Sequence, residues 1–318
     1  MNAFSLRITL LAIGAGFAAT GIAQDKLGEL KPRAAEIAVK TEKNLMLGIA
    51  RAGERLVAVG DRGGILVSDK GSDWKQAPTP VHSTLTAVSF ADDKTGWAVG
   101  HDLAILHTGD GGSTWTLQYH EPTQARPWLG VLALDAQRAY AVGAYGAFMA
   151  TVDGGTTWTA VTAPALLDDG LHLNSIIRLG NGDLFVAGET GLLGVLDGQT
   201  WRRLRLPYDG SLFGALPRGE RGALVFGLRG NAFVTSDVRS GQWTRLNTGT
   251  VQSLFGGARL DNGEAVLVGS DGAVLVVGAD NKVRTGAKAE GAATYSGVLS
   301  ASDGLWIAGE TGLSRQKL

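Results

Sequence analysis

The sequence predicts an all-β protein, a seven-bladed β-propeller whose blades are four-stranded antiparallel sheets. A short apolar motif that ends in glycine, such as Gly96-Trp97-Ala98-Val99-Gly100, returns every 39 to 45 residues. A tight turn follows each copy, and most repeats also contain a stretch that begins with Trp. Four-stranded meanders with a period of about 40–45 residues are typical of propeller blades. The seven glycines that close the motif are Gly60, Gly100, Gly143, Gly188, Gly227, Gly269 and Gly309.

Each repeat is expected to contribute four strands in order. The first is an apolar opening segment, and the second is the motif that ends in glycine. The third leads into a second turn, and the fourth begins at a Trp in most repeats. A helical solenoid would need apolar residues at i, i+3 and i+4 and would not tolerate two glycine turns per repeat. The openings cover residues 45–50, 85–90, 128–134, 173–179, 212–216, 251–255 and 295–300, and the fourth strands begin at Trp74, Trp115, Trp158, Trp201, Trp243 and Val283.

The turn after the second strand has the form x-x-Gly in six repeats, as in Asp61-Arg62-Gly63. Such a turn needs positive φ, which Gly adopts without steric cost, and it joins adjacent antiparallel strands. The exception is His101-Asp102-Leu103, which has no glycine.

Composition supports a globular protein and excludes several classes of function. The chain has 318 residues, 44% of them hydrophobic, which is enough for one or two domains with a sizeable core. Its 47 glycines and only 8 prolines favour many tight turns over disorder. A net charge of -1 argues against a nucleic-acid partner. Because the chain has no Cys, disulfides, thiolate metal sites and cysteine nucleophiles are excluded.

The N-terminus has the pattern of a secretory signal peptide. Arg7 precedes an apolar run from Ile8 to Ala19, and small residues lead to a cleavage point near Ala23. We therefore expect residues 1–23 to be a signal peptide and the mature protein to be exported to the periplasm; an uncleaved membrane anchor is the alternative. No later apolar stretch approaches the roughly 20 residues that a transmembrane helix needs, so the mature chain is expected to have no span.

The remaining chain divides into an N-terminal segment, residues 24–44, and the propeller, residues 45–318. Within the first segment, Ala34 to Thr41 fits either a short strand or a helical turn. The seventh repeat has room for three strands but not a fourth, and an open edge strand would leave unpaired backbone groups. We therefore expect Ala34 to Thr41 to supply the outer strand of the last blade.

The turns between the third and fourth strands carry a second motif, Ser/Thr-x-Asp-x-Gly-x-Thr-Trp. It resembles the Asp-box, also called the bacterial neuraminidase repeat. The carboxylate can accept hydrogen bonds from turn N–H groups and the Trp can pack between blades, so we expect these residues to be structural. The full copies are Thr108, Asp110, Gly112, Thr114 and Trp115, and Thr151, Asp153, Gly155, Thr157 and Trp158; Asp69, Gly71 and Trp74 form a degraded copy.

Taken together, the repeats resemble the photosystem II stability/assembly factor family. The resemblance covers all seven repeats and is strongest in the first three, where Leu85 to Phe90, Gly96 to His101 and Ile105 to Trp115 carry it. It implies an exported, non-enzymatic seven-bladed propeller that assists assembly of photosystem II in photosynthesis; some relatives in bacteria without a photosystem accompany envelope transporters. We expect a monomer without cofactor that binds a protein partner, such as a membrane protein or envelope complex.

The turns after the second strands and the crossovers between blades should share one face of a propeller. They would form a mixed ring of charged and aromatic side chains that suits a protein partner, with Arg and aromatic residues as anchors; solvated turn residues are the plainer interpretation. The candidates for this partner-binding face are Asp61, Arg62, His101, Asp102, Arg126, Trp128, Tyr145, Glu189, Arg229, Asp271 and Glu310, and the crossovers add His82, His120, His172, Tyr208 and Asp209.

A sialidase-like glycoside hydrolase is the alternative function. Such a site needs several Arg, a Tyr nucleophile paired with a Glu, and an acid; the candidates are Arg62, Arg229, Tyr145 and Glu189. They fall on different turns without a supporting motif, so no catalytic residues are expected. No close-spaced His pair favours a metal site, so none is expected.

Overall fold

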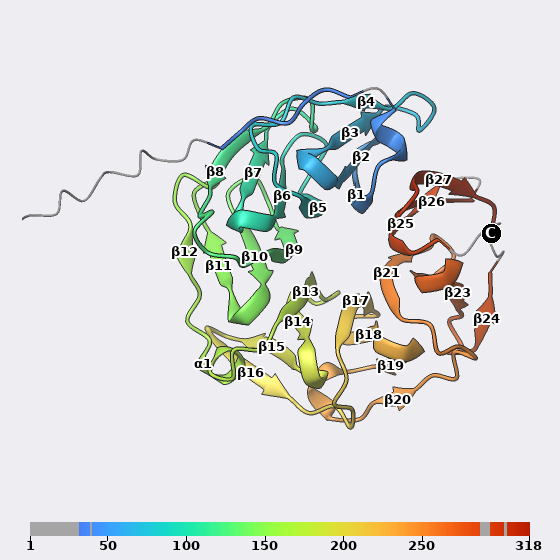
Figure 1. Ribbon diagram of the computed structural model, residues 1–318. Helices are drawn as coiled ribbons and strands as arrows, with labels where there is room; N and C mark the ends of the chain where they lie inside the picture. The colour runs from blue at the N-terminus through green and yellow to red at the C-terminus, as the bar shows by residue number, and fades with distance from the viewer. Residues whose placement is uncertain (1–31, 39, 287–292, 302–303) are drawn as a thin grey trace, which may run out of the picture. The chain divides into compact units, whose positions relative to one another are not determined.

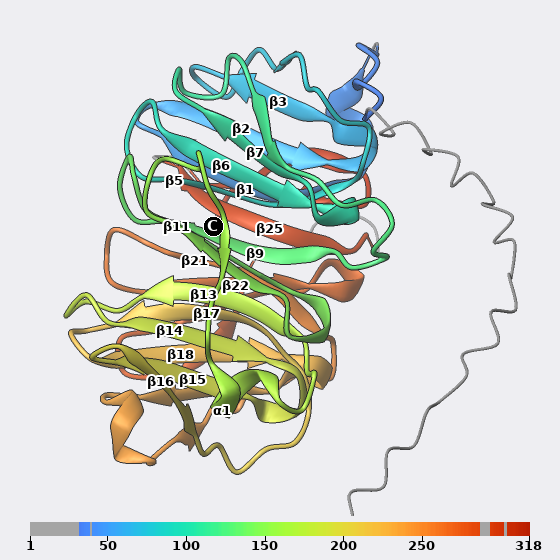
Figure 2. The ribbon, with the colours of Figure 1, turned by 90° about the vertical axis from the view of Figure 1, so that its left-hand side faces the viewer.

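The computed structural model describes residues 32–38, 40–286, 293–301 and 304–318. Within this part of the chain, seven small antiparallel sheets stand around a common axis, as the sequence predicts (Figure 1). Figure 2 shows the same sheets from the side. The predicted signal peptide, residues 1–23, lies outside the described residues.

The strands follow each other in space in the order of the chain. Each blade places its first strand innermost and its later strands progressively farther out. Blades 1 to 3 contain β1 (Met46–Ala52), β2 (Arg55–Gly60), β3 (Ile65–Ser68) and β4 (Lys75–Gln76); β5 (Leu85–Phe90), β6 (Gly96–Gly100), β7 (Ile105–Thr108) and β8 (Thr116–Tyr119); and β9 (Trp128–Ala133), β10 (Ala139–Gly143), β11 (Phe148–Thr151) and β12 (Thr159–Ala160). Blades 4 to 7 contain β13 (Leu173–Arg178), β14 (Leu184–Gly188), β15 (Leu193–Asp197) and β16 (Thr200–Leu204); β17 (Leu212–Arg218), β18 (Gly222–Gly227), β19 (Ala232–Thr235) and β20 (Thr244–Arg245); β21 (Leu254–Arg259), β22 (Ala265–Gly269), β23 (Val274–Val277) and β24 (Val283–Thr285); and β25 (Tyr295–Ala301), β26 (Gly304–Gly309) and β27 (Gly312–Gln316).

The inner strands approach each other closely around the axis. In every blade the pairing register of the inner strand shifts at its second residue, and the third residue is small. A Cβ atom on Gly256 would lie 2.6 Å from the carbonyl oxygen of Ser296 in the next blade, so a larger residue would push the two strands apart. The small residues are Gly48, Ala87, Gly130, Ser175, Gly214, Gly256 and Gly297.

The core lies between neighbouring blades rather than within one sheet. Trp97 of β6 and Trp128 of β9 are almost fully buried in one cluster that joins blades 2 and 3. Val57 of β2 and Leu106 of β7 share another cluster, between blades 1 and 2. Burying one such side chain contributes about 2–3 kcal/mol. Each blade therefore depends on its neighbours for most of its stability.

The last blade does not close as the sequence suggested. Its described sheet has three strands, β25, β26 and β27, and residues 32–38 form no strand. The Ala35 N–H instead donates to the carbonyl of Thr79 (3.0 Å), and the Ala38 N–H donates to the side chain of Gln76 (2.9 Å). The prediction that Ala34 to Thr41 completes blade 7 is therefore wrong for the described residues, because this segment lies along the outer edge of blade 1.

The ring closes through packing of blade 7 on blade 1. The inner strand β25 lies against β1, and the Trp306 ring meets the Trp74 ring edge-on at 5.5 Å between centroids. The short 3-10 helix η1 (Thr41–Lys43) packs on Gly312, where a Cβ atom would lie 2.0 Å from the Glu42 carbonyl oxygen. In the described part of the chain, no helix is long and apolar enough to cross a membrane.

Candidate functional site

The turns after the second strands lie on the same side of the ring as the crossovers between blades. In each blade, the first N–H of the turn donates to the carbonyl just before that blade's inner strand, as Glu189 does to His172 (2.9 Å). We call this side, formed by these turns, the Glu310–Thr311 turn and the crossovers, the turn face. Its 3-10 turns are η2 (Asp61–Gly63), η3 (His101–Leu103), η4 (Ala144–Gly146), η5 (Glu189–Gly191), η6 (Leu228–Gly230) and η8 (Ser270–Gly272).

The central residue of each 3-10 turn has a left-handed backbone. This conformation costs a non-glycine residue about 1–2 kcal/mol. Five of these six residues are exposed, and Asp102 is half-buried. The turn without glycine keeps the same shape, since Leu103 also has a positive φ of 51°. The central residues are Arg62, Asp102, Tyr145, Thr190, Arg229 and Asp271, of which Thr190 is absent from the predicted set.

Four carboxylates of the predicted face hold the crossovers in place. Asp61 accepts a hydrogen bond from the Thr84 hydroxyl (3.1 Å), and Asp102 accepts one from Ser83. Glu189 and Glu310 occupy equivalent positions and accept the backbone N–H that precedes the inner strand, in each case at 3.2 Å. These side chains therefore brace the face from within.

Trp128 is not available to a partner. It is 1% exposed and packs in the core between blades 2 and 3, so its assignment to the partner-binding face is wrong. The repeat pattern contained the signal, because Trp128 opens its inner strand at the position of Met46 and Leu85, which are fully buried. Arg126, two residues earlier, is exposed.

Tyr145, His172 and Glu189 meet where blades 3 and 4 adjoin. The Tyr145 and His172 rings are 4.8 Å apart between centroids and inclined at 61°. The His172 Nδ1 lies 3.1 Å from Glu189 Oε2. Tyr145 remains 58% exposed. Each of the three residues was a candidate for this face, but their contact is not encoded locally, since they come from two separate turns and a crossover.

A basic cavity lies between the blade 5 turn, the end of β20 and the crossover that leads to blade 6. It has a volume of about 710 Å³ and is lined by Arg229, Arg245 and the crossover residues 246–251. Val251 at its rim is 79% exposed. Neither guanidinium has a hydrogen-bond or ion-pair partner among the described residues. Within the described structure, the cavity therefore combines two guanidinium groups free to donate hydrogen bonds with the apolar side chain of Val251.

The central cavity of the ring is small and partly apolar. The inner strands enclose a cavity of about 310 Å³, whose lining includes Phe213 and Phe255 at 5.1 Å between ring centroids. The Asn174 amide donates to the Leu212 carbonyl (2.8 Å), and the Thr86 hydroxyl donates to the Trp128 carbonyl (2.7 Å). These polar groups tie neighbouring inner strands together.

In the two full Asp-boxes, the polar groups of the turn form hydrogen bonds with one another. Asp110 accepts the Thr114 N–H (2.9 Å) and hydroxyl (2.6 Å), while the Thr108 hydroxyl accepts the Gly112 N–H (2.9 Å). Asp153 repeats these contacts in blade 3, where the backbone N–H of Thr157 lowers its pKa to about 2. Both carboxylates serve their own turns.

The degraded copy in blade 1 does not form a box. Asp69 pairs with Arg55 (2.7 Å) instead of its own turn. The Ser68 hydroxyl, at the position of Thr108, is buried without a hydrogen-bond partner in the described structure. The residue two positions after Ser68 is Lys70, where the full boxes have Asp110 or Asp153, so no carboxylate stands at the box position.

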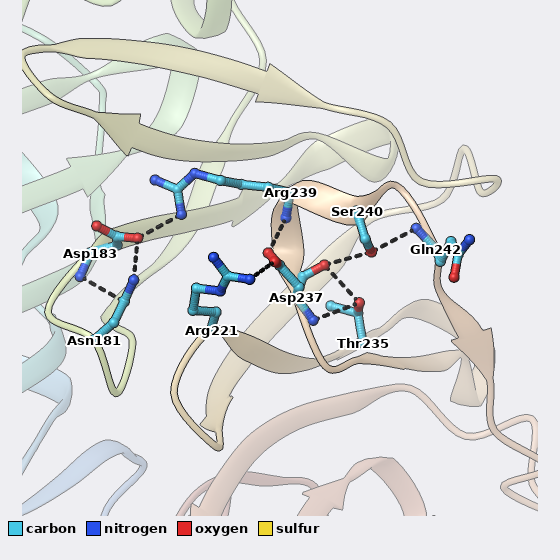
Figure 3. A network of polar contacts seen from close by, with 8 residues as sticks. All are labelled: Asn181, Asp183, Arg221, Thr235, Asp237, Arg239, Ser240 and Gln242. Atoms are coloured by element: carbon cyan, nitrogen blue, oxygen red, sulfur yellow. Dashed lines mark hydrogen bonds and ion pairs between the residues drawn. The ribbon is translucent and has the colours of Figure 1, made fainter.

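Blade 5 contains a related turn that sequence analysis missed (Figure 3). Asp237 accepts the Arg239 N–H (2.9 Å) and pairs with Arg221 (2.6 Å), and Arg239 pairs with Asp183 of blade 4 (2.6 Å). The available signal was the Thr235-x-Asp237 spacing ahead of Trp243, which matches the start of the full boxes.

The candidate hydrolase residues do not come together in one site, and neither does a set of metal ligands among the described residues. Tyr145 and Glu189 both contact His172, but Arg62 and Arg229 lie on the turns of blades 1 and 5. In residues 32–38, 40–286, 293–301 and 304–318, no three His, Asp or Glu side chains come close enough to share a metal ion.

Known proteins resemble this chain at two levels. The sequence model of the family described as Photosynthesis system II assembly factor YCF48 matches residues 66–126 and 123–283, more than half of the chain. A curated relative, the chloroplastic photosystem II stability/assembly factor HCF136 of Cyanidioschyzon merolae, is 44% identical over 48 residues, which are 14% of this chain and 11% of the relative.

Two solved structures have the same fold. The structure titled "YCF48 bound to D1 peptide" matches with a TM-score of 0.68 and 19% identity, over 88% of this chain and 94% of the other. YCF48 from Cyanidioschyzon merolae matches with a TM-score of 0.69 and 17% identity, over 88% and 97%. At these identities the likeness establishes the fold alone.

Proposed function

Because this chain belongs to the family described as Photosynthesis system II assembly factor YCF48, we propose that it is a non-enzymatic, protein-binding assembly or accessory factor. A protein of the same fold is described as bound to a D1 peptide, which supports a peptide segment as the bound element. The partner we propose is a membrane protein or envelope complex that presents an extended segment to the turn face.

The basic cavity beside the blade 5 turn is the single observation that carries this proposal. Among the described residues, the guanidinium groups of Arg229 and Arg245 have no partner. Such groups bind carboxylates and backbone carbonyls with planar, multiple hydrogen bonds. Exposed Val251 adds an apolar contact at the rim. A peptide presents this combination of carbonyl groups and side chains along its length.

Site-specific photo-crosslinking tests the proposal. A photo-reactive amino acid at Val251 is expected to capture a membrane protein in the host cell, and the double change Arg229→Glu with Arg245→Glu is expected to abolish that capture. Asn262 lies in the β21–β22 hairpin on the opposite face and is the matched position for the control probe. Equal capture from both positions would contradict docking at the turn face.

The glycoside hydrolase alternative has a separate test. The separation of Arg62 and Arg229 from the Tyr145 cluster supports a protein without hydrolase activity. Purified protein is expected to leave a fluorogenic sialidase substrate unchanged. Turnover that Tyr145→Phe abolishes would replace the binding proposal with an enzymatic one.

We also propose export through the N-terminal signal peptide. Arg7 and the apolar run that follows it support this. N-terminal sequencing of protein recovered from the periplasm should start at Gln24. Protein that keeps Met1 in the membrane fraction would favour the uncleaved anchor.

A further inference from the structure

Tyr145, His172 and Glu189 form a cluster on the turn face that the basic cavity does not include. We infer that this cluster is a receptor for a positively charged side chain, a lysine or arginine carried by the bound segment of the partner protein. The inference rests on the proposed function, since it names the chemistry of the segment that the turn face would bind.

The cluster holds an exposed aromatic ring in a fixed position. Tyr145 has a φ of 54°, which an aromatic residue adopts only where the surrounding structure enforces it. The next residue, Gly146, donates its N–H to the Leu171 carbonyl of the crossover (2.9 Å). The helix α1 (Pro164–Leu167) packs against the same turn. The ring therefore projects to solvent from a backbone anchored on two sides.

The Glu189 carboxylate is held beside His172. Its Oε2 lies 3.1 Å from the His172 Nδ1 and accepts the His172 backbone N–H (3.2 Å). Among the described residues, no hydrogen bond uses Nε2, the Oε1 of Glu189 or the Tyr145 hydroxyl.

Two groups of the cluster attract positive charge. The Oε1 of the Glu189 carboxylate is a hydrogen-bond acceptor, and the face of an exposed tyrosine ring binds ammonium and guanidinium groups. The neighbouring crossover strengthens this preference: residues 161–172 contain Asp168 and Asp169 and no Lys or Arg. Arg203 neutralises Asp169 alone, whereas Asp168 is exposed and has no ion-pair partner in the described structure.

A pair of synthetic tripeptides tests the inference. Acetyl-Gly-Arg-Gly-amide and the same peptide with citrulline in place of arginine have nearly the same shape, but citrulline is uncharged. In an NMR titration, the arginine peptide is expected to shift the amide resonances of Tyr145, His172 and Glu189, with affinity about tenfold above that of the citrulline peptide. Equal affinities, or shifts elsewhere on the surface only, would overturn it.

Variants separate this site from general attraction to acidic surface. Tyr145→Ala and Glu189→Gln are each expected to weaken arginine-peptide binding about fivefold or more. Asp271→Asn is the matched control, because Asp271 is exposed at the equivalent turn position of blade 6, and it should leave the affinity unchanged. If Tyr145→Ala lowers the yield of folded protein, Tyr145→Gly tests the same loss, since Gly accepts positive φ.

The two proposals fail in different ways. If the tripeptides bind equally while Val251 still captures its partner, the cation receptor is wrong and the proposed function stands. If the arginine peptide binds selectively while Val251 captures nothing, the cation receptor is supported and the proposed docking at the basic cavity is wrong.

Discussion

The turns between the third and fourth strands hold the same place in blades 2, 3 and 5, yet they are stabilised in two ways. In blades 2 and 3, short hydroxyl and backbone groups of the turn itself hold Asp110 and Asp153. In blade 5, arginines hold the turn, and Arg239 reaches Asp183 of blade 4. The first solution is local, whereas the second couples two blades.

The local solution should be the more costly to remove. Thr108 is almost fully buried, and its hydroxyl both accepts the Gly112 N–H and donates to Asp110. Thr108→Ala is expected to lower the free energy of unfolding by about 2–3 kcal/mol, because it leaves a buried N–H unpaired. Chemical denaturation measures this loss. Thr116→Ala, at an exposed position of β8, should cost far less; similar losses would contradict the role assigned to the buried hydroxyl.

The arginine-held turn should be weaker and sensitive to salt. Asp237→Ala removes the acceptor of the Arg239 N–H and the partner of Arg221, at an expected cost of about 1–2 kcal/mol. Part of this cost should disappear at about 1 M NaCl, where exposed charges are screened. Denaturation at low and high salt measures it, with the exposed Asp261→Ala as control. A cost that does not change with salt would show that backbone capping alone matters.

The stability that Asp153 contributes to its turn should depend on pH. Its pKa is about 2 in the folded protein, below the ordinary 3.8, because the Thr157 N–H and hydroxyl stabilise the carboxylate. A lowered folded-state pKa contributes stability that is complete above about pH 4 and disappears as the pH falls toward 2. The difference in Tm between wild type and Asp153→Asn should therefore shrink across that window. A difference that stays constant down to pH 2 would exclude the carboxylate as its origin.

The blade 1 turn should respond least. Because the Ser68 hydroxyl is buried without a partner in the described structure, removing it leaves no other group unpaired. Ser68→Ala is expected to change stability by less than about 1 kcal/mol, in the stabilising direction. Chemical denaturation of Ser68→Ala and Thr108→Ala in parallel tests this, since the two residues occupy equivalent positions. A loss comparable to that of Thr108→Ala would show that Ser68 has a partner after all.

The turn face shows a second contrast, between its basic cavity and its acidic, aromatic cluster. Arg229 and Arg245 line one sector, and Glu189 with Asp168 lies in another. A bound segment that carries opposite charges at two points would have only one favourable orientation. The two proposed sites together would therefore fix the direction of the segment as well as its affinity.

Repeat spacing and local patterns determined the architecture of this protein. Seven copies of a glycine-terminated motif, with their turns and Trp-led stretches, specify blades because each signal depends on residues close together in the chain. The full Asp-boxes are likewise encoded within eight residues, so Asp110 and Asp153 could be assigned without coordinates.

Contacts between blades were decided only by the tertiary structure. Trp128 is buried because blade 2 packs against it, and Ala34 to Ala38 lie along blade 1 because Gln76 and Thr79 offer partners there. Tyr145, His172 and Glu189 meet only because the ring brings the turns of blades 3 and 4 together. Such contacts depend on how the sheets pack around the axis, which a repeat pattern does not encode.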